Sequence, residues 1–185
     1  MRIFRESNPT LSVHAEGVAG LARRMGKRLN LDSEDLDVLW RAAELHDIGK
    51  LAIPGDILNK PGPLDDVEWE LMRGHTLVGA RLLGASRPMQ RVGELIRSSH
   101  EHWDGKGYPD GLAGEDIPLG SRIICVCDAF DAMIGPRPYR PALSTEEAIA
   151  ELRRCAGTQF EPSLVELFCE LITLQETVGE TLIHA

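Results

Sequence analysis

An apolar stripe with helical spacing ends in a histidine followed directly by an aspartate, and this feature constrains the fold most. Leu36, Leu39, Ala43 and His46 lie three or four residues apart, so a helix over 33–46 carries them on one face. We expect this apolar face to be buried, with the imidazole directed into the interior. The carboxylate of Asp47 projects about 100° further round and can reach the same cavity.

Two interpretations of the pair are open at this point. The two residues are either a satisfied polar pair of the core, in which the histidine hydrogen-bonds its neighbour, or part of a cation site. Gly49 allows the helix to end there, and Lys50 follows as a positive charge that can meet an anionic substrate or a metal-bound water. The other histidines of the chain have to decide between the two interpretations.

The length of 185 residues suits one domain, which we expect over residues 1–175, followed by a C-terminal tail over 176–185. No apolar run approaches the roughly 18 residues of a membrane span, and the start of the chain lacks the apolar segment of a signal peptide. The sequence therefore predicts a cytoplasmic protein that does not enter a membrane.

The charge balance limits the partners. The chain has 29 acidic and 20 basic residues and a net charge of -9, which argues against broad binding of a nucleic-acid polymer. An anionic substrate therefore needs a local cationic site. The four cysteines follow no metal-ligand spacing, so we expect reduced thiols in the core at Cys125, Cys127, Cys155 and Cys169.

Helical periodicity predicts an all-α fold, a single compact bundle of about seven helices with a metal site in its core. Two segments are rich in glycine and proline. Residues 51–64 are expected to be a loop with one short turn, and residues 105–118 a loop that neighbouring structure holds. The expected helices cover residues 11–29, 33–46, 65–82, 89–100, 120–134, 144–155 and 161–174.

Further histidines fall on faces that are expected to be buried. His14 lies on the apolar stripe of the first predicted helix, and His75 shares a predicted face with Leu71, Val78 and Leu82. Histidine is an uncommon residue in a core that serves packing alone. The repeated placement of imidazoles on apolar stripes favours the cation site.

Carboxylates join these histidines. His100 ends a predicted helix beside the glycine-rich loop, and Asp128 and Asp131 share one face of an otherwise apolar helix. Buried carboxylates are costly unless they are paired or metal-bound. Imidazole and carboxylate ligands without thiolates favour iron or manganese, with zinc, nickel or magnesium as alternatives. Ligands of this number can hold two metal ions, with Asp47 bridging them.

Several separate motifs carry a resemblance to a known family. They are HDIGK at 46–50, HEHWDGKGYPDGL at 100–112, RIICVCDAFDAM at 122–133 and RPYRPALSTEEA at 137–148. Over about residues 11–170 the chain resembles the HD-GYP subgroup of the HD-domain metal-dependent phosphohydrolases. The resemblance implies an all-α domain, a centre of two or three metals, and hydrolysis of cyclic di-GMP to linear pGpG or onward to GMP.

The resemblance also assigns roles to single residues. The implied metal ligands are His14, His46, Asp47, His75, His100 and Asp128. The implied catalytic residues are Asp47 and Lys50. The implied substrate contacts are Tyr108 of the GYP signature, Asp131, Arg137, Arg140 and again Lys50.

Two positions depart from the family's pattern. Ser99 stands where the family usually has a further histidine, so one imidazole is missing from the shell of the second metal. Thr10 stands where members with a third metal have glutamate, which predicts two divalent metals here. His102 is an alternative ligand for the missing position, although an exposed loop position is the favoured interpretation.

The resemblance thus implies a cyclic dinucleotide phosphodiesterase that works through a hydroxide bridging two metals. An alternative is a catalytically impaired domain that serves as a receptor for cyclic di-GMP or contacts a signalling protein through the GYP segment, and Ser99 supports it. A di-iron centre for oxygen chemistry fits the phosphate-binding motifs less well. A purely structural bundle does not explain the inward polar residues.

Overall fold

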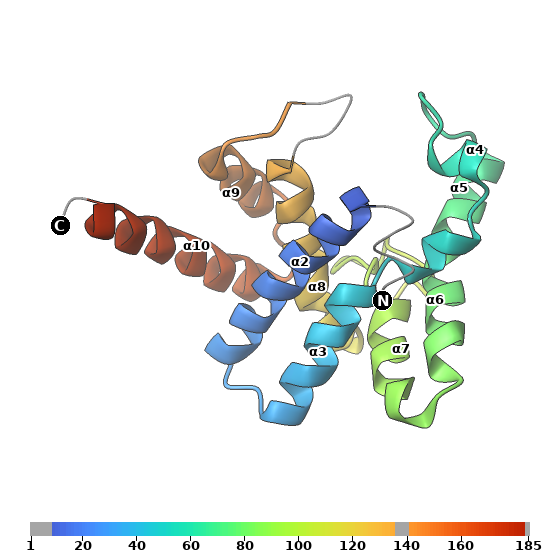
Figure 1. The fold of residues 1–185 in the computed structure, drawn as a ribbon, viewed down its shortest axis with the longest axis horizontal. Helices are drawn as coiled ribbons and strands as arrows, with labels where there is room; N and C mark the ends of the chain where they lie inside the picture. The colour runs from blue at the N-terminus through green and yellow to red at the C-terminus, as the bar shows by residue number, and fades with distance from the viewer. Residues whose placement is uncertain (1–8, 136–140, 184–185) are drawn as a thin grey trace.

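The computed structural model describes residues 9–135 and 141–183, and every regular element in these ranges is helical (Figure 1). The α-helices are α2 (Pro9–Arg28), α3 (Ser33–Leu45), α4 (Gly55–Leu58), α5 (Asp66–Arg73), α6 (His75–Gly84), α7 (Gln90–Arg97), α8 (Leu119–Ile134), α9 (Thr145–Arg154) and α10 (Pro162–Ile183). The 3₁₀ helices are η1 (Ile48–Ala52), η2 (Arg87–Met89) and η3 (Gly114–Asp116). The all-α prediction is confirmed.

The helices pack as a bundle around α8. Helices α2, α3, α7 and α6 follow one another side by side in Figure 1, and α8 lies behind α2 and α3, with which it is in contact. Helix α8 is the most deeply buried helix, because its apolar residues face the bundle on nearly all sides. The core that it forms includes Val18, Leu39, Ile96, Ile124 and Phe168.

Local sequence signals explain where several helices begin. The carboxylate of Asp32 accepts a hydrogen bond from the backbone N–H of Asp35 and so caps α3. Asp65 and Glu68 form a reciprocal capping box at the start of α5. The same motif recurs with Ser144 at the start of α9. These caps fix where α3, α5 and α9 begin, and α3 ends at the interior polar cluster described below.

The predicted helix over 65–82 is two helices. It is divided at Gly74, which ends α5 and precedes α6, so the proposed stripe of apolar residues around His75 is interrupted. Leu71 is 48% exposed and Leu82 is 57% exposed, whereas the His75 side chain is buried. The inward direction of His75 was predicted correctly, but the shared buried face was wrong.

The last helix is longer than predicted, whereas the expected division into a domain over 1–175 and a tail over 176–185 stays a prediction. Helix α10 continues to Ile183, through most of the segment 176–185 that we expected to be a tail (Figure 1). Its apolar residues between 164 and 172 pack against α8 and α9. In the part of the chain that the structure describes, no helix is long and apolar enough to cross a membrane.

Candidate metal centre

Side chains from several chain segments converge on one buried cluster. His14 comes from the second turn of α2, and His46 and Asp47 come from the junction of α3 and η1. His75 is the first residue of α6, and His100 follows the end of α7. Asp128 comes from the middle of α8. Each of these residues was predicted as a ligand, and the fold brings all six together.

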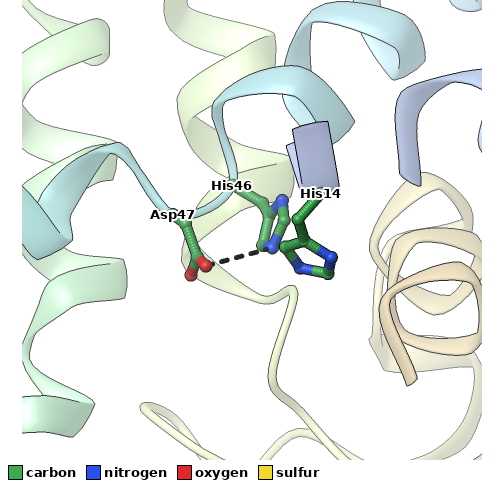
Figure 2. A group of neighbouring side chains, drawn as sticks. All are labelled: His14, His46 and Asp47. Carbon is green, nitrogen blue, oxygen red and sulfur yellow. Dashed lines mark ion pairs between the residues drawn. The ribbon is translucent and has the colours of Figure 1, made fainter. Parts of the chain in front are cut away.

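One group of candidate ligands consists of His14, His46 and Asp47. One nitrogen or oxygen atom from each lies within 4.8 Å of the others. Figure 2 shows the three side chains directed toward one another, with Nε2 of His46 3.5 Å from Oδ2 of Asp47. Oδ1 of Asp128 lies 2.9 Å from Nε2 of His14 and 3.7 Å from Nε2 of His46, so it joins this group.

A second group consists of Asp47, His75 and His100, whose ligand atoms again lie within 4.8 Å of one another. Nε2 of His75 is 3.4 Å from Oδ1 of Asp47, whereas His46 approaches Oδ2 of the same carboxylate. Each oxygen of Asp47 therefore faces a different group. This is the arrangement that a carboxylate needs in order to bridge two metal ions.

Backbone carbonyls and a carboxylate fix the orientation of three imidazoles. Nδ1 of His46 lies 2.8 Å from the carbonyl oxygen of Ala43, and Nδ1 of His75 lies 2.7 Å from the carbonyl oxygen of Met72. Because a carbonyl only accepts, each Nδ1 carries a proton, and in the neutral ring Nε2 keeps a lone pair directed toward Asp47. Such outer hydrogen bonds are typical of metal-binding histidines.

Asp131 plays this orienting part for His14. Its Oδ2 lies 2.6 Å from Nδ1 of His14, and a side chain at Gly17 would overlap its other oxygen. The structure thus places Asp131 behind a candidate ligand. The predicted substrate contact of Asp131 is not tested by this geometry.

Several buried polar atoms of the cluster have no hydrogen-bond partner among the described residues. They are Nε2 of His46, Oδ1 of Asp47, Nε2 of His75 and Nε2 of His100. A buried polar atom without a partner costs about 1–3 kcal/mol, so four together are not accounted for by packing. All four belong to the two candidate ligand groups, and as electron-pair donors they fit divalent cations by position and by chemistry.

The electrostatics of the cluster favour ligation. Burial lowers the pKa of His100 to about 4, so its ring is neutral at pH 7. Burial raises the pKa of Asp47, but His46 and Lys50 outweigh that effect and hold the pKa well below its usual range. Burial lowers the pKa of His14, but hydrogen bonds to Asp128 and Asp131 outweigh burial and raise it to about 9. The proton that this raised pKa leaves on His14 lies beside carboxylates, in the place where a cation would bind.

Lys50 and Gly49 complete the HDIGK motif. Nζ of Lys50 donates to Oδ2 of Asp47 over 2.6 Å, so the ammonium group is held at the cluster. Gly49 lies within η1, and a methyl group built on it would overlap the carbonyl oxygen of His75. Our interpretation of Gly49 as a helix stop was therefore incomplete. The glycine allows η1 and α6 to approach closely.

The GYP loop, which we define as residues 103–112, covers one side of the cluster. The ring of Tyr108 stacks on the imidazole of His100, with centroids 5.2 Å apart and planes 9° apart. The carboxylate of Glu101 accepts hydrogen bonds from the backbone N–H groups of Asp110 and Gly111. Arg97 forms a bidentate ion pair with Asp110. Neighbouring structure holds this loop, as predicted.

Other predicted positions lie apart from the cluster. The hydroxyl of Ser99 is buried and donates to the carbonyl oxygen of Ile96, so it faces its own helix. His102 is half-buried, and neither candidate ligand group contains it. Arg137 and Arg140, and the side chain of Thr10, lie outside the described residues.

Sequence reasoning missed two residues beside the cluster. Glu101 is 2% exposed and anchors the GYP loop, although it belongs to the quoted motif. Arg73 lies with its guanidinium carbon 5.7 Å from the ring centroid of Tyr108. Neither is marked by periodicity, because both act through contacts with a segment distant in the sequence.

The helical bundle and the converging ligand groups define an all-α domain built around a candidate dinuclear metal centre. Comparisons with known proteins agree. The family model of the HD domain matches residues 1–164. A 3'3'-cGAMP-specific phosphodiesterase of Vibrio cholerae serotype O1 is 42% identical over 159 residues, which are 85% of this chain and 30% of that protein. A cyclic di-GMP phosphodiesterase of Thermotoga maritima is 41% identical over 160 residues, 85% of this chain and 44% of that protein.

Solved structures give the same fold. A crystal structure of a cyclic GMP-AMP specific phosphodiesterase of V. cholerae matches with a TM-score of 0.69 and 26% identity, over 86% of this chain and 44% of that one. An HDG"Y"P protein of Bdellovibrio bacteriovorus matches with a TM-score of 0.72 over 89% of this chain and 53% of that one, and its 20% identity shows the fold alone. The chain spans less than half the length of the two curated relatives. The chain belongs to the HD-domain family, and its motifs at 46–50 and 100–112 are those of the HD-GYP branch.

Proposed function

We propose that this domain hydrolyses a cyclic dinucleotide, with cyclic di-GMP as the first substrate to test and pGpG or GMP as the product. The observation that carries the proposal is the pair of ligand groups that share Asp47, with four buried ligand atoms left without hydrogen-bond partners. A shared carboxylate between two imidazole-rich groups suits a two-metal phosphodiesterase.

Two divalent cations, iron or manganese by the donor set, fit these groups. His14, His46 and Asp128 would hold one, His75 and His100 the other, and Asp47 both. When bound, the cations supply Lewis acidity at the phosphoryl oxygens and lower the pKa of coordinated water.

The chain's own residues prepare the site for an anionic diester. Asp131 and the carbonyl oxygens of Ala43 and Met72 hold three imidazoles in the tautomer that ligates. Lys50 brings a fixed positive charge to the edge of the cluster, where it would stabilise charge on the phosphoryl oxygens. Tyr108, which stacks on His100, is proposed to contact the substrate, as are Arg137 and Arg140 from the segment that follows α8.

The relatives narrow the substrate class. The Thermotoga maritima relative is named for cyclic di-GMP and the Vibrio cholerae relative for 3'3'-cGAMP. A structural neighbour, the HD domain of a phosphodiesterase from L. monocytogenes, is in complex with cyclic-di-AMP, although its 16% identity limits that likeness to the fold. We therefore propose a guanine-containing cyclic dinucleotide.

The test is turnover of cyclic di-GMP and 3'3'-cGAMP by protein prepared without oxygen and loaded with Fe(II) or Mn(II), with metal counted on the same sample. We expect two metals per chain and conversion to pGpG or GMP. Asp47→Ala should lose metal and activity together, whereas Asp37→Ala, which removes an exposed carboxylate paired only with Arg41, should keep both. Full turnover by the Asp47 variant would refute the proposal.

Ser99 favours a second candidate function. Its hydroxyl faces Ile96, so the group formed by Asp47, His75 and His100 has three protein ligands and no fourth imidazole from this position. A domain of this kind could act as a receptor for the cyclic dinucleotide, with a signalling protein contacting the GYP loop. Tight binding of cyclic di-GMP without conversion, by protein that holds its metals, would select the receptor.

A further inference from the structure

Arg73 lies between two aromatic side chains at the edge of the candidate metal centre. Its guanidinium carbon is 5.9 Å from the ring centroid of Trp69 and 5.7 Å from that of Tyr108. Trp69 belongs to the same helix, one turn earlier, whereas Tyr108 comes from the GYP loop. Arg73 therefore joins α5 to the loop that covers the cluster, and two cation–π contacts hold its charge in place.

The charge of Arg73 is not matched by a carboxylate among the residues that the structure describes. Other arginines near the GYP loop are paired, Arg97 with Asp110 and Arg122 with Glu161. Lys50, the lysine of the HDIGK motif, is paired with Asp47. In a chain of net charge -9, an arginine fixed beside a candidate active site without a carboxylate indicates a binding site for an anion.

The place of Arg73 separates this anion from the one at the metals. The ring of Tyr108 stacks on the candidate ligand His100, and Arg73 contacts that same ring. No cluster carboxylate forms an ion pair with Arg73 within the described residues. The contact that the structure gives between Arg73 and the cluster runs through the ring of Tyr108, so an anion bound to Arg73 is placed beside the group at the metals.

A cyclic dinucleotide supplies this second anion, because its ring contains two phosphodiester groups. We propose that Arg73 binds the phosphate that is not being cleaved, and that Trp69 is a positioning residue that holds the guanidinium for this contact. This inference rests on the proposed function. Aromatic contacts use the flat faces of a guanidinium and leave its N–H edge free, and that edge matches two phosphate oxygens.

The experiment compares a substrate that has two phosphates with one that has a single phosphate. Wild type and Arg73→Gln are assayed with cyclic di-GMP and with bis(p-nitrophenyl) phosphate, which carries one phosphodiester. We expect kcat/KM for cyclic di-GMP to fall about tenfold to a hundredfold, mainly through KM, since a charged hydrogen-bonded pair is lost. The value for bis(p-nitrophenyl) phosphate should stay within about twofold.

Matched variants control for charge and for structure. Arg81→Gln removes an exposed arginine from the last turn of α6 and should leave kcat/KM unchanged for both substrates. Arg73→Lys keeps the charge without the planar fork and should recover only part of the loss. Trp69→Leu should raise KM for cyclic di-GMP by a few-fold and leave kcat unchanged, because Trp69 positions Arg73 and does not itself contact the substrate.

Three results would overturn the assignment. Equal losses of kcat/KM for both substrates would mean that Arg73 contacts the scissile phosphate or supports the structure of the site. No loss of kcat/KM for either substrate would show that Arg73 binds neither phosphate. If Arg73→Gln lowered kcat/KM for cyclic di-GMP but left kcat/KM for cyclic di-AMP unchanged, the arginine would contact guanine and not phosphate.

Binding separates this inference from the proposed hydrolysis. If metal-loaded wild type binds cyclic di-GMP without cleaving it, the hydrolytic function fails, and calorimetry on wild type and Arg73→Gln still measures the arginine's contribution. A loss of affinity of about tenfold or more would then support the role of Arg73 in a receptor. If wild type neither binds nor cleaves cyclic dinucleotides, both proposals fail.

Discussion

Gly49 packs directly against the backbone of His75. A methyl group built on Gly49 would overlap the carbonyl oxygen of His75 and lie 2.8 Å from the backbone nitrogen of Gly79. The HDIGK segment and α6 each carry a candidate ligand, so this contact sets the distance between Asp47 and His75. A hydrogen atom is the only side chain that this spacing admits.

Gly49→Ala should therefore damage the metal centre. The methyl group meets backbone atoms, which cannot rotate away, so η1 and α6 must separate. We expect a loss of about 3 kcal/mol or more in the free energy of unfolding and a lower metal content, measured by denaturant unfolding and elemental analysis. The control is Gly20→Ala in the middle of α2, where a methyl group meets nothing within 4 Å and should stabilise by about 1 kcal/mol. Equal stability of the two variants would contradict the argument.

Asp131→Asn should weaken one metal site and spare the other. The carboxylate orients His14, which belongs to only one of the two ligand groups, and loss of such an outer partner costs about tenfold to a hundredfold in metal affinity. Metal titration should show one weakened site and one unchanged site. A raised KM for cyclic di-GMP with both metals bound normally would instead favour the substrate contact that the family resemblance implies.

The sequence predicted the helices well where the signal was local, and it predicted which candidate ligands would lie together. His46 ends an apolar stripe and Asp128 lies inside an apolar helix, and helical periodicity reads such positions directly. The stripe proposed around His75, by contrast, is interrupted. The break between α5 and α6 was missed because Gly74 keeps a right-handed helical backbone, with φ of -61° and ψ of -14°. The signal that could have found this break is the glycine itself.

The remaining features depend on contacts between distant segments. Nothing near Gly49 in the sequence indicates that α6 will lie against it, and nothing near Arg73 indicates that Tyr108 will. Likewise, Glu101 anchors the GYP loop only because the fold brings the backbone N–H of Asp110 to its carboxylate. Such roles arise from tertiary packing, so a local pattern does not contain them.

Glu101→Gln should loosen the GYP loop more than Arg97→Gln does, although both side chains hold Asp110. Glu101 is buried and accepts two backbone hydrogen bonds, at 2.6 and 3.1 Å, whereas the pair of Arg97 with Asp110 lies at the surface. A charged acceptor in a buried site contributes about 1.5–3 kcal/mol, and an exposed pair 0–1 kcal/mol at about 25 °C. Thermal unfolding and protease cleavage within 103–112 would measure the difference. Equal effects would show that burial does not decide the anchoring.

Lys50→Met should separate catalysis from metal binding. The ammonium group lies 2.6 Å from Oδ2 of Asp47, where it competes with a cation for the carboxylate and can stabilise charge on a bound phosphoryl group. We expect the same metal content as in the wild type and a fall in kcat of about a hundredfold, the usual effect of removing one such donor. Lys60→Met, which breaks a comparable ion pair with Glu68 between α4 and α5, should leave kcat unchanged. Loss of metal in the Lys50 variant would show that the lysine serves Asp47 and not the substrate, because its charge would then be needed to hold the carboxylate in place.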